Sequence, residues 1–465
     1  MASTNPRQFG RKNSRVTGAL IGVLGALSAV IYGYNFRLGG VLTAFWPATS
    51  IQTYLALFAV LSVLYLAAVR LVIHCPGTAR QSKGLLWVIW VLAVVFRLLL
   101  VLEEPTVLSS DMYRFIWDGR IQHNGFNPYR YPPQDEALKN LRDHRIYPHI
   151  NRKAARTIYP AGAQLFFRAV YTLVGDSVTG FKGAMVVCDI SALAVMAALL
   201  KSIAHDPTRL LIYAWNPLVV FEIAYSGHLE GLTVLLMVGA FYLAIRHSNL
   251  WGVLLLALSS AIKLYPALLL PALLNRLWRI KGPLIFGVVF GLLYLPYMAI
   301  GSKTMGFLPV YLKNPYETFN LGLKSLIMHY FPGLNYFTLS LLFIAGLLAA
   351  AFWVLVKDKD HDNMLFYGYV LTGWLMILMP AALHPWYVIL IVPFLVLYPN
   401  AAWLIFSCTV SLSYVKYVTP QGIMPTWVLF GEYLPLMALL AAGSIYHRLT
   451  PSGSGPTRPS KGAGP

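Results

Sequence analysis

The chain has 465 residues, of which 58% are hydrophobic and only 11% charged, and its mean hydropathy is +0.62. Soluble domains carry about 25% charged residues, so the composition excludes an ordinary soluble protein and indicates a polytopic membrane protein. The net charge of +19 is typical of the Lys/Arg excess in cytoplasmic loops. No basic stripe stands outside the apolar segments, which argues against nucleic-acid binding. The three cysteines show no paired spacing, so neither a disulfide framework nor a zinc site is expected.

Apolar runs long enough to cross a bilayer, about 20 residues each, recur along almost the whole chain. They predict an all-α polytopic membrane protein, a helical bundle of about 12–14 membrane segments. The clearest runs are 16–35, 51–73, 84–102, 179–200, 282–300, 334–356 and 428–446.

The distribution of basic residues predicts the side on which each loop lies. Arg7, Arg11, Lys12 and Arg15 precede the first run and place the N-terminus in the cytoplasm. Three spans then bring the chain to the opposite side at Glu103. Residues 103–178 contain no strong spanning run and hold eight of the seventeen acidic residues. We therefore expect a large extracytoplasmic loop there.

The chain is next expected to cross the membrane at 179–200, at 210–226 and at 230–246. The following segment, 249–281, begins and ends on basic residues, yet its apolar part is too short to cross twice at about 1.5 Å per residue. It predicts a broken hairpin with Lys263 and Pro266 near the apex. Irregular backbone at that depth needs a protein wall or a water-filled cavity, so we expect Lys263 to point into a cavity.

The remaining runs complete a four-part organisation. We expect an exterior loop at 301–333, a cytoplasmic turn at 357–362 and an exterior turn at "ALHPWY". No internal repeat is visible, unlike in many duplicated transporters. The expected parts are 1–83 with two leading spans, the membrane module 84–400 with external loop 103–178, the spans of 401–446, and a Gly/Pro/Ser-rich disordered cytoplasmic tail at 447–465.

The external loop opens with "SSDMYRFIWDGRIQHNGFNPYRYPP" at 109–133, which joins acidic, basic and aromatic residues. Three consecutive N-cap residues precede a predicted amphipathic helix that would lie along the membrane surface. The Asn-Gly, Asn-Pro and Pro-Pro pairs then predict a stiff loop. A second amphipathic segment, "TIYPAGAQLFFRAVYTLVG", leads back toward the membrane.

Each acid of this stretch has a structural and a functional interpretation. Asp111 is placed either to cap the helix or to act as a base at the outer membrane surface. Asp118 is placed either to pair with Arg114, four residues earlier on the helix, or to be that base.

The stretch resembles the GT-C superfamily of integral-membrane glycosyltransferases, above all bacterial mannosyltransferase-like members that use polyprenyl-phosphate sugars. The resemblance covers roughly 84–400 and continues through "TIYPAGAQLFF", "AWNPLVVFEIAYSGHLEGL", "SSAIKLYPALLLP" and "HPWYVILIVPFL". Three spans precede the acidic loop here, whereas many members of the superfamily have one.

The resemblance implies roles for particular residues. An acid of the first large external loop is the catalytic base, which matches Asp111 by position, with Asp118 as the second candidate. The donor phosphate is expected to contact Arg114, Arg120, Lys263 and His384. The substrate cavity is expected to include Tyr113, Trp117, Tyr129, Glu222, His228 and Glu230. Some members use a divalent cation such as Mg²⁺ or Mn²⁺, and the spacing of the residues leaves the metal open.

The resemblance implies the inverting transfer of a hexose to a hydroxyl of a glycan, lipid or protein acceptor. Mannose is the expected hexose because it is the sugar that the nearest relatives transfer. The protein would lie in the bacterial cytoplasmic (inner) membrane with its active site facing the periplasm or exterior. The main alternative is a transporter or flippase of a lipid-linked or small polar substrate. A lipid-pyrophosphate ligase or polymerase and a non-catalytic scaffold remain further alternatives.

Overall fold

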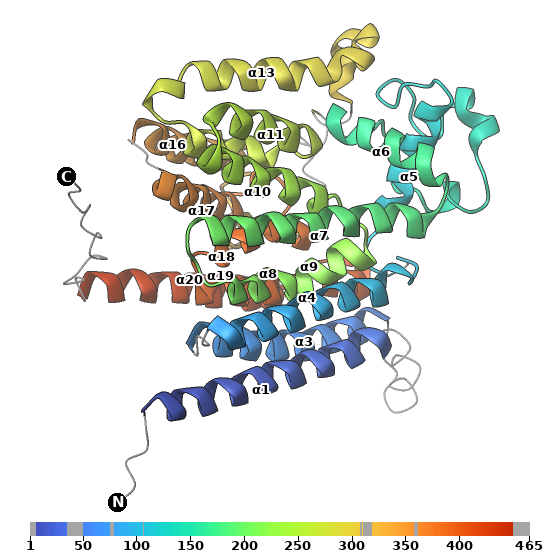
Figure 1. The fold of residues 1–465 in the computed structure, drawn as a ribbon. Helices are drawn as coiled ribbons and strands as arrows, with labels where there is room; N and C mark the ends of the chain where they lie inside the picture. The colour runs from blue at the N-terminus through green and yellow to red at the C-terminus, as the bar shows by residue number, and fades with distance from the viewer. Residues whose placement is uncertain are drawn as a thin grey trace, which may run out of the picture.

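The computed structural model describes residues 6–34, 50–74, 79–105, 107–306, 309, 319–357 and 361–449. All regular structure in these residues is helical, which confirms the all-α polytopic fold (Figure 1). Within the described ranges, eight helices are long and apolar enough to cross a membrane. They are Val16–Tyr34, Ser50–His74, Lys83–Val101, Val178–Ser202, Lys281–Gly301, Tyr336–Val356, Ala401–Val418 and Thr426–Ser444. All seven clearest apolar runs are among them, and the expected total of about 12–14 segments stays a prediction.

The helices of the membrane part follow one another in chain order. Their bounds are α1 Pro6–Tyr34, α3 Ser50–His74, α4 Ala79–Val101, α7 Val178–Ser202, α10 Glu230–Arg246, α11 Asn249–Ile262, α13 Lys281–Tyr294, α15 Leu323–Tyr330, α16 Tyr336–Val356, α17 His361–Ile377, α19 Ala401–Thr409 and α20 Thr426–Leu449. Short helices connect several of them, notably α8 Leu211–Ala214, α9 Pro217–Val220, α12 Leu270–Leu273 and α18 Val392–Leu395.

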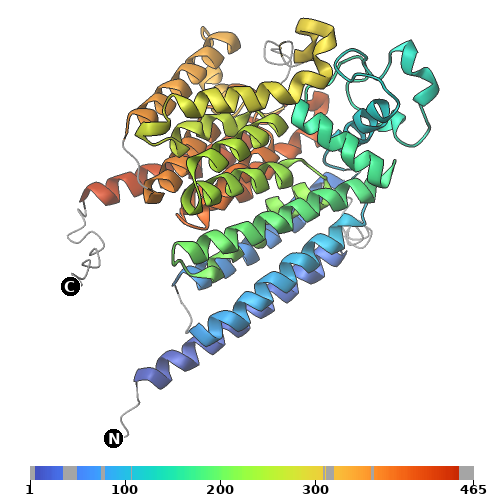
Figure 2. The same ribbon diagram turned by 45° about the horizontal axis from the view of Figure 1, so that its top comes forward.

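The external segment lies at one end of the bundle. It comprises α5 Asp111–His123, the 3-10 helices η1 Glu136–Leu141 and η2 Tyr147–His149, and α6 Ala161–Val174. The start of α1 and the end of α20 lie at the opposite end of the bundle in Figures 1 and 2. No membrane-length helix occurs between Val101 and Val178 in the residues that the structure describes. This arrangement agrees with the count of three spans before the acidic loop.

The segment expected to cross at 210–226 is interrupted rather than continuous. α8 ends at Ala214, and α9 begins at Pro217 after Asn216, whose side chain accepts hydrogen bonds from the backbone N–H groups of Leu218 and Val219. Proline removes a helical donor and the asparagine caps the new start. The segment is therefore built of consecutive short helices, because the Asn-Pro pair begins a new helix.

The broken hairpin at 249–281 is confirmed. α11 ends at Ile262, and Lys263 has extended backbone angles before the 3-10 helix η5 (Tyr265–Leu269) leads back along α11. Lys263 is 9% exposed and forms an ion pair with Glu230 at the start of α10. The break therefore fixes a charged side chain at the end of α11.

α5 is covered on nearly its whole circumference instead of presenting one face to the membrane surface. Residues Met112 to Gln122 are all buried. A Cβ atom at Gly119 would lie 2.7 Å from the backbone oxygen of Phe167, so glycine is what allows α5 and α6 to approach this closely. The position and orientation of Asp111 are thus set by packing inside the protein.

Arg120 fastens α5 to the rest of the external segment. Its guanidinium donates hydrogen bonds to Asp143 and Asp176, both at 2.7 Å, and to the backbone oxygen of Leu141. The side chain is almost completely buried. Arg120 forms ion pairs with both acids, so its side chain connects α5 to three other parts of the external segment.

Asp143 makes the stability of this fastening dependent on pH. Burial alone would raise the pKa of Asp143, but hydrogen bonds from Arg120 and two backbone N–H groups outweigh it and lower the pKa to about 2. A carboxylate whose pKa is lowered in the folded state stabilises the fold at pH values above its unfolded pKa of about 3.9. This contribution is lost as the pH falls toward 2.

We expect the free energy of unfolding of wild type to exceed that of Asp143→Asn by about 1 kcal/mol at pH 6, allowing for solvent screening. Thermal unfolding should show this difference between the two proteins disappearing between about pH 4 and pH 2. A difference that stays constant with pH would contradict the role of the Asp143 carboxylate in the fastening.

Candidate functional site

A cavity of about 740 Å³ lies at the junction of the external segment with the membrane helices, and we call it the central cavity. Its walls come from the loop before α5, the start of α5, the loop between η2 and α6, and the C-terminal half of the chain. The last of these contributes Phe319, His384, Trp386, Tyr387, Lys416 and Tyr417. Lys263 of the broken hairpin also lines it, as expected. The volume is within the range of ligand pockets.

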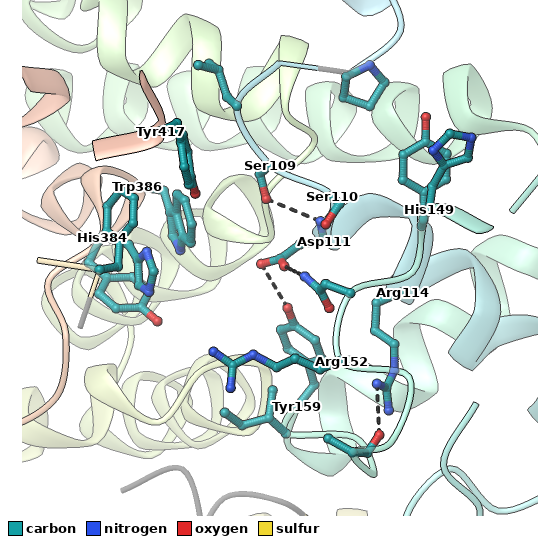
Figure 3. Close-up of a pocket in the computed structure, with 18 of the residues that line it drawn as sticks. Ser109, Ser110, Asp111, Arg114, His149, Arg152, Tyr159, His384, Trp386 and Tyr417 are labelled. Atoms are coloured by element: carbon teal, nitrogen blue, oxygen red, sulfur yellow. Dashed lines mark hydrogen bonds between the residues drawn. The ribbon is translucent and has the colours of Figure 1, made fainter. Parts of the chain in front are cut away.

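Asp111 is the first residue of α5, and its carboxylate faces the central cavity (Figure 3). Asn151 Nδ2 donates to Oδ1 at 2.7 Å, and the Tyr159 hydroxyl donates to Oδ2 at 3.2 Å. Burial and the nearby Asp111 charge raise the pKa of Tyr159 well above its usual value, so the phenol remains a donor. The preceding residue, Ser110, occupies the N-cap position. The Asp111 side chain is therefore held by loop donors and presented to the cavity.

The lining of the central cavity is strongly cationic. Among the described residues, its lining includes five basic side chains and one carboxylate, that of Asp111; the bases are Arg114, Arg152, Arg156, Lys263 and Lys416. Two of them are tied to buried acids, because Arg114 pairs with Asp118 at 2.8 Å and Lys263 pairs with Glu230. Such a set of donors is suited to an anionic ligand, above all a phosphate.

Asp118 is separated from the cavity. Its side chain is fully buried and accepts hydrogen bonds from Arg114 and from Gln164 Nε2, the latter at 2.9 Å. The ion pair with Arg114 that its spacing predicts is therefore confirmed. A carboxylate without exposed surface cannot reach a substrate hydroxyl in this conformation, which favours Asp111 over Asp118 as the base.

The expected phosphate ligands divide into two groups. Arg114, Lys263 and His384 line the central cavity, whereas Arg120 does not and is engaged by Asp143 and Asp176. His384 stacks between Phe319 and Trp386, with ring centroids 4.8 and 4.4 Å away, and its side chain makes no cap hydrogen bond to the helix that follows. Burial lowers the pKa of His384 to about 3. A neutral imidazole at this position offers a phosphate a hydrogen bond.

The three acidic and histidine residues expected in the cavity from "FEIAYSGHLEG" lie behind its wall. Glu222 Oε2 is 3.0 Å from His228 Nδ1, and the His228 ring stacks on Trp386 at 4.0 Å between centroids. Glu230 holds Lys263. All three are almost completely buried. His228 and Glu230 contact residues that line the cavity, Glu222 contacts His228 and Tyr414, and none of the three lines it.

The turn that carries His228 packs directly under α5. Gly227 has a φ of 75°, and a Cβ atom there would collide with the side chain of Met112. Both the backbone angle and the close approach favour glycine. This contact connects the "SGHLEG" turn to the helix that begins with Asp111.

The expected aromatic contacts are only partly present at the site. Tyr113 lines the central cavity and stacks on His149 at 4.8 Å. Trp117 instead packs against Tyr147 and Arg120, and Tyr129 donates a hydrogen bond to the backbone oxygen of Tyr159. Trp117 and Tyr129 therefore make structural contacts and do not line the central cavity.

Sequence reasoning missed most of the loop that faces Asp111. Asn151, Arg152, Arg156 and Tyr159 all come from an irregular segment between η2 and α6. The segment "NRKAARTIYP" does show an unusual density of basic residues in an external loop. That density was the available signal.

The donors present do not form a recognisable metal site. In the part of the chain that the structure describes, no three His, Cys, Asp or Glu side chains converge in a way that would hold a metal ion. The neighbours of the Asp111 carboxylate are an amide and a phenol.

Comparison with known proteins adds two findings. The family model described as "Alpha-(1->6)-mannopyranosyltransferase, N-terminal domain" matches residues 15–279. "Alpha-(1->6)-mannopyranosyltransferase A" of Mycobacterium tuberculosis (strain ATCC 25618 / H37Rv) is 28% identical over 181 residues, which is 37% of this chain and 34% of the relative. The match thus spans about a third of that relative's length. No solved structure matches the chain significantly.

Proposed function

Because the chain belongs to this family of alpha-(1->6)-mannopyranosyltransferases, we propose that it transfers mannose from a polyprenyl-phosphate donor to a hydroxyl acceptor, with Asp111 as the base. The family match covers more than half of the chain and includes α5, the loop that faces it, and Lys263. The acceptor is a glycan, lipid or protein that carries a free hydroxyl. The protein is a multi-pass membrane protein, and we place it in a bacterial cytoplasmic membrane.

The observation that carries this proposal is that Asp111 has the only carboxylate among the described residues that line the central cavity, and that its neighbours there are cationic. A phosphate is a good leaving group without protonation, so transfer needs one base and a site that stabilises the departing anion. Asp111, held by Asn151 and Tyr159, supplies the base. The basic side chains of the cavity supply the electrostatic stabilisation, which is strong where water is excluded.

The reaction follows from these two parts. The acceptor hydroxyl gives its proton to Asp111 as its oxygen attacks the anomeric carbon, and the bond to the phosphate oxygen breaks. Attack on the face opposite the phosphate inverts that carbon, so a β-linked donor gives an α-glycoside. The α linkage in the name of the family agrees with this outcome.

The position of the cavity suits a lipid-linked donor. It is lined both by the external segment and by residues near the ends of membrane helices, such as Lys263 and Lys416. A phosphate there would lie at the membrane boundary while a polyprenyl tail extends among apolar helices. Together with the count of spans, this supports a site that faces the periplasm or exterior.

The class of donor is testable with purified protein in lipid nanodiscs. We expect radiolabel to pass to a membrane glycolipid extract from polyprenyl-phosphate mannose and not from a nucleotide-activated mannose, because the site has no soluble nucleotide domain beside it among the described residues. Equal transfer from the nucleotide sugar would contradict the donor assignment. Movement of the labelled lipid across a vesicle membrane without transfer would identify a flippase instead.

A further inference from the structure

A second, smaller cavity adjoins the central one, and we call it the outer chamber. It has a volume of about 350 Å³ and is lined by Glu104, Tyr113, His144, Arg145, His149 and Val178. Its walls come from the loop after α4, the start of α5, the loop before η2, η2 itself and the start of α7. Its volume is at the lower end of the range for ligand pockets.

The two cavities share one wall. Tyr113 and His149 line both, and their rings stack at 4.8 Å with an interplanar angle of 29°. Tyr113 is only two positions after Asp111 on α5. In Figure 3 His149 lies on the opposite side of Asp111 from His384 and Trp386. The outer chamber therefore borders the central cavity close to the base.

The charges of the two cavities differ in kind. Counted over the described residues, the central cavity has five basic side chains and one carboxylate, whereas the outer chamber has one carboxylate, Glu104, and one guanidinium, Arg145, besides two histidines. The first set favours an anion. The second set can accept hydrogen bonds from hydroxyl groups and donate to them, which is what a neutral polyhydroxylated ligand requires.

The polar side chains of the outer chamber are available for such a ligand. Glu104, His144, Arg145 and His149 are exposed. Glu104 and Arg145 make no ion pair or side-chain hydrogen bond with other residues in the described ranges. Burial, with Glu104 as a second cause, raises the pKa of Tyr113, so its hydroxyl stays a donor beside them.

We propose that the outer chamber binds the sugar residues of a neutral oligosaccharide acceptor, with the stacked Tyr113 and His149 between these residues and the reacting hydroxyl. This deepens the proposed function and rests on it. The donor phosphate occupies the cationic central cavity, and the acceptor enters from the outer side so that its terminal hydroxyl reaches Asp111. The acceptor chain then extends over the external face, away from the membrane.

The test separates binding of the acceptor from binding of the donor. We expect Glu104→Gln and Arg145→Ala each to raise the acceptor KM about tenfold, the effect of losing one hydrogen bond to a charged group, without changing kcat or the donor KM. Lys139→Ala is the matched control, since Lys139 is an exposed base of the same external segment that does not line either cavity. Because all three side chains are exposed, the variants should keep the thermal unfolding of wild type.

A second measurement is independent of turnover. Binding of α-linked mannotriose to donor-free protein, followed by calorimetry, should weaken about tenfold in Arg145→Ala and stay unchanged in Lys139→Ala. If the protein transfers no sugar from any donor, the proposed function fails and this binding measurement alone decides about the chamber. An unchanged affinity, or a change in the donor KM instead of the acceptor KM, would overturn the inference.

Discussion

Asp111→Asn is expected to lower kcat by about 10²- to 10⁴-fold, the usual contribution of a general base. The amide has nearly the shape of the carboxylate but cannot accept the proton of the acceptor hydroxyl. Its oxygen can still accept from Asn151, and the Tyr159 hydroxyl can rotate to accept from the new amide group. In the proposed function the donor phosphate contacts other residues, so the donor KM should change little. Steady-state transfer of radiolabelled mannose measures both constants.

The control for this substitution is Asp135→Asn in the same external segment. Asp135 caps η1 by accepting a hydrogen bond from the backbone N–H of Ala137, a role that asparagine also performs. It should retain wild-type kcat. If Asp111→Asn also retains it while binding donor normally, Asp111 only shapes the loop, and Asp118 becomes the base to test in spite of its burial.

Lys263→Met is expected to lower kcat/KM for the donor by roughly 10²- to 10³-fold, the effect of removing one preorganised group that stabilises developing charge. Lys263 lines the central cavity, pairs with Glu230 and lies 5.1 Å from the ring centre of Tyr387. The substitution also leaves Glu230 buried without its partner, which is destabilising. Loss of activity alone would therefore not distinguish a functional lysine from a structural one.

The double variant Lys263→Met/Glu230→Gln makes that distinction. It removes both charges, so the unpaired buried carboxylate disappears and the unfolding temperature should return toward that of wild type. Activity should stay low because the phosphate still lacks its cation. Full recovery of kcat/KM in the double variant would mean that the pair serves folding only.

The membrane part of the fold was largely predictable from the sequence because hydropathy and length suffice for it. All seven clearest runs became membrane-length helices, and the break at Lys263 followed from a segment too short to cross twice. The irregular crossing near Asn216 was missed because hydropathy does not register where a helix restarts. The division of the chain into four parts stays a prediction, and residues 450–465 of the expected tail lie outside the described residues.

The candidate site was predictable only where a residue's own chemistry was unusual for its place. An acid at the start of an external helix indicated Asp111, and a lysine at the break of an apolar hairpin indicated Lys263. The sequence also showed that Glu222, His228 and Glu230 are costly in a membrane. It could not show that Glu222 lies beside His228 and that Glu230 pairs with Lys263 behind the cavity wall. Glu230 and Lys263, for example, meet only when α10 and α11 pack together. Asn151 and Tyr159 reach Asp111 through an irregular loop, for which periodicity offers no guide.

The central claim is a single displacement by the acceptor oxygen, with one base accepting its proton. The anomeric configuration of the transferred mannose tests this claim most directly. Purified wild type would be supplied with β-linked polyprenyl-phosphate mannose and an oligosaccharide acceptor, and the new linkage read by NMR. The account predicts an α-mannoside with one polyprenyl phosphate released for each sugar transferred. A β-mannoside would require two successive displacements and a nucleophile on the protein, and would contradict the role assigned to Asp111.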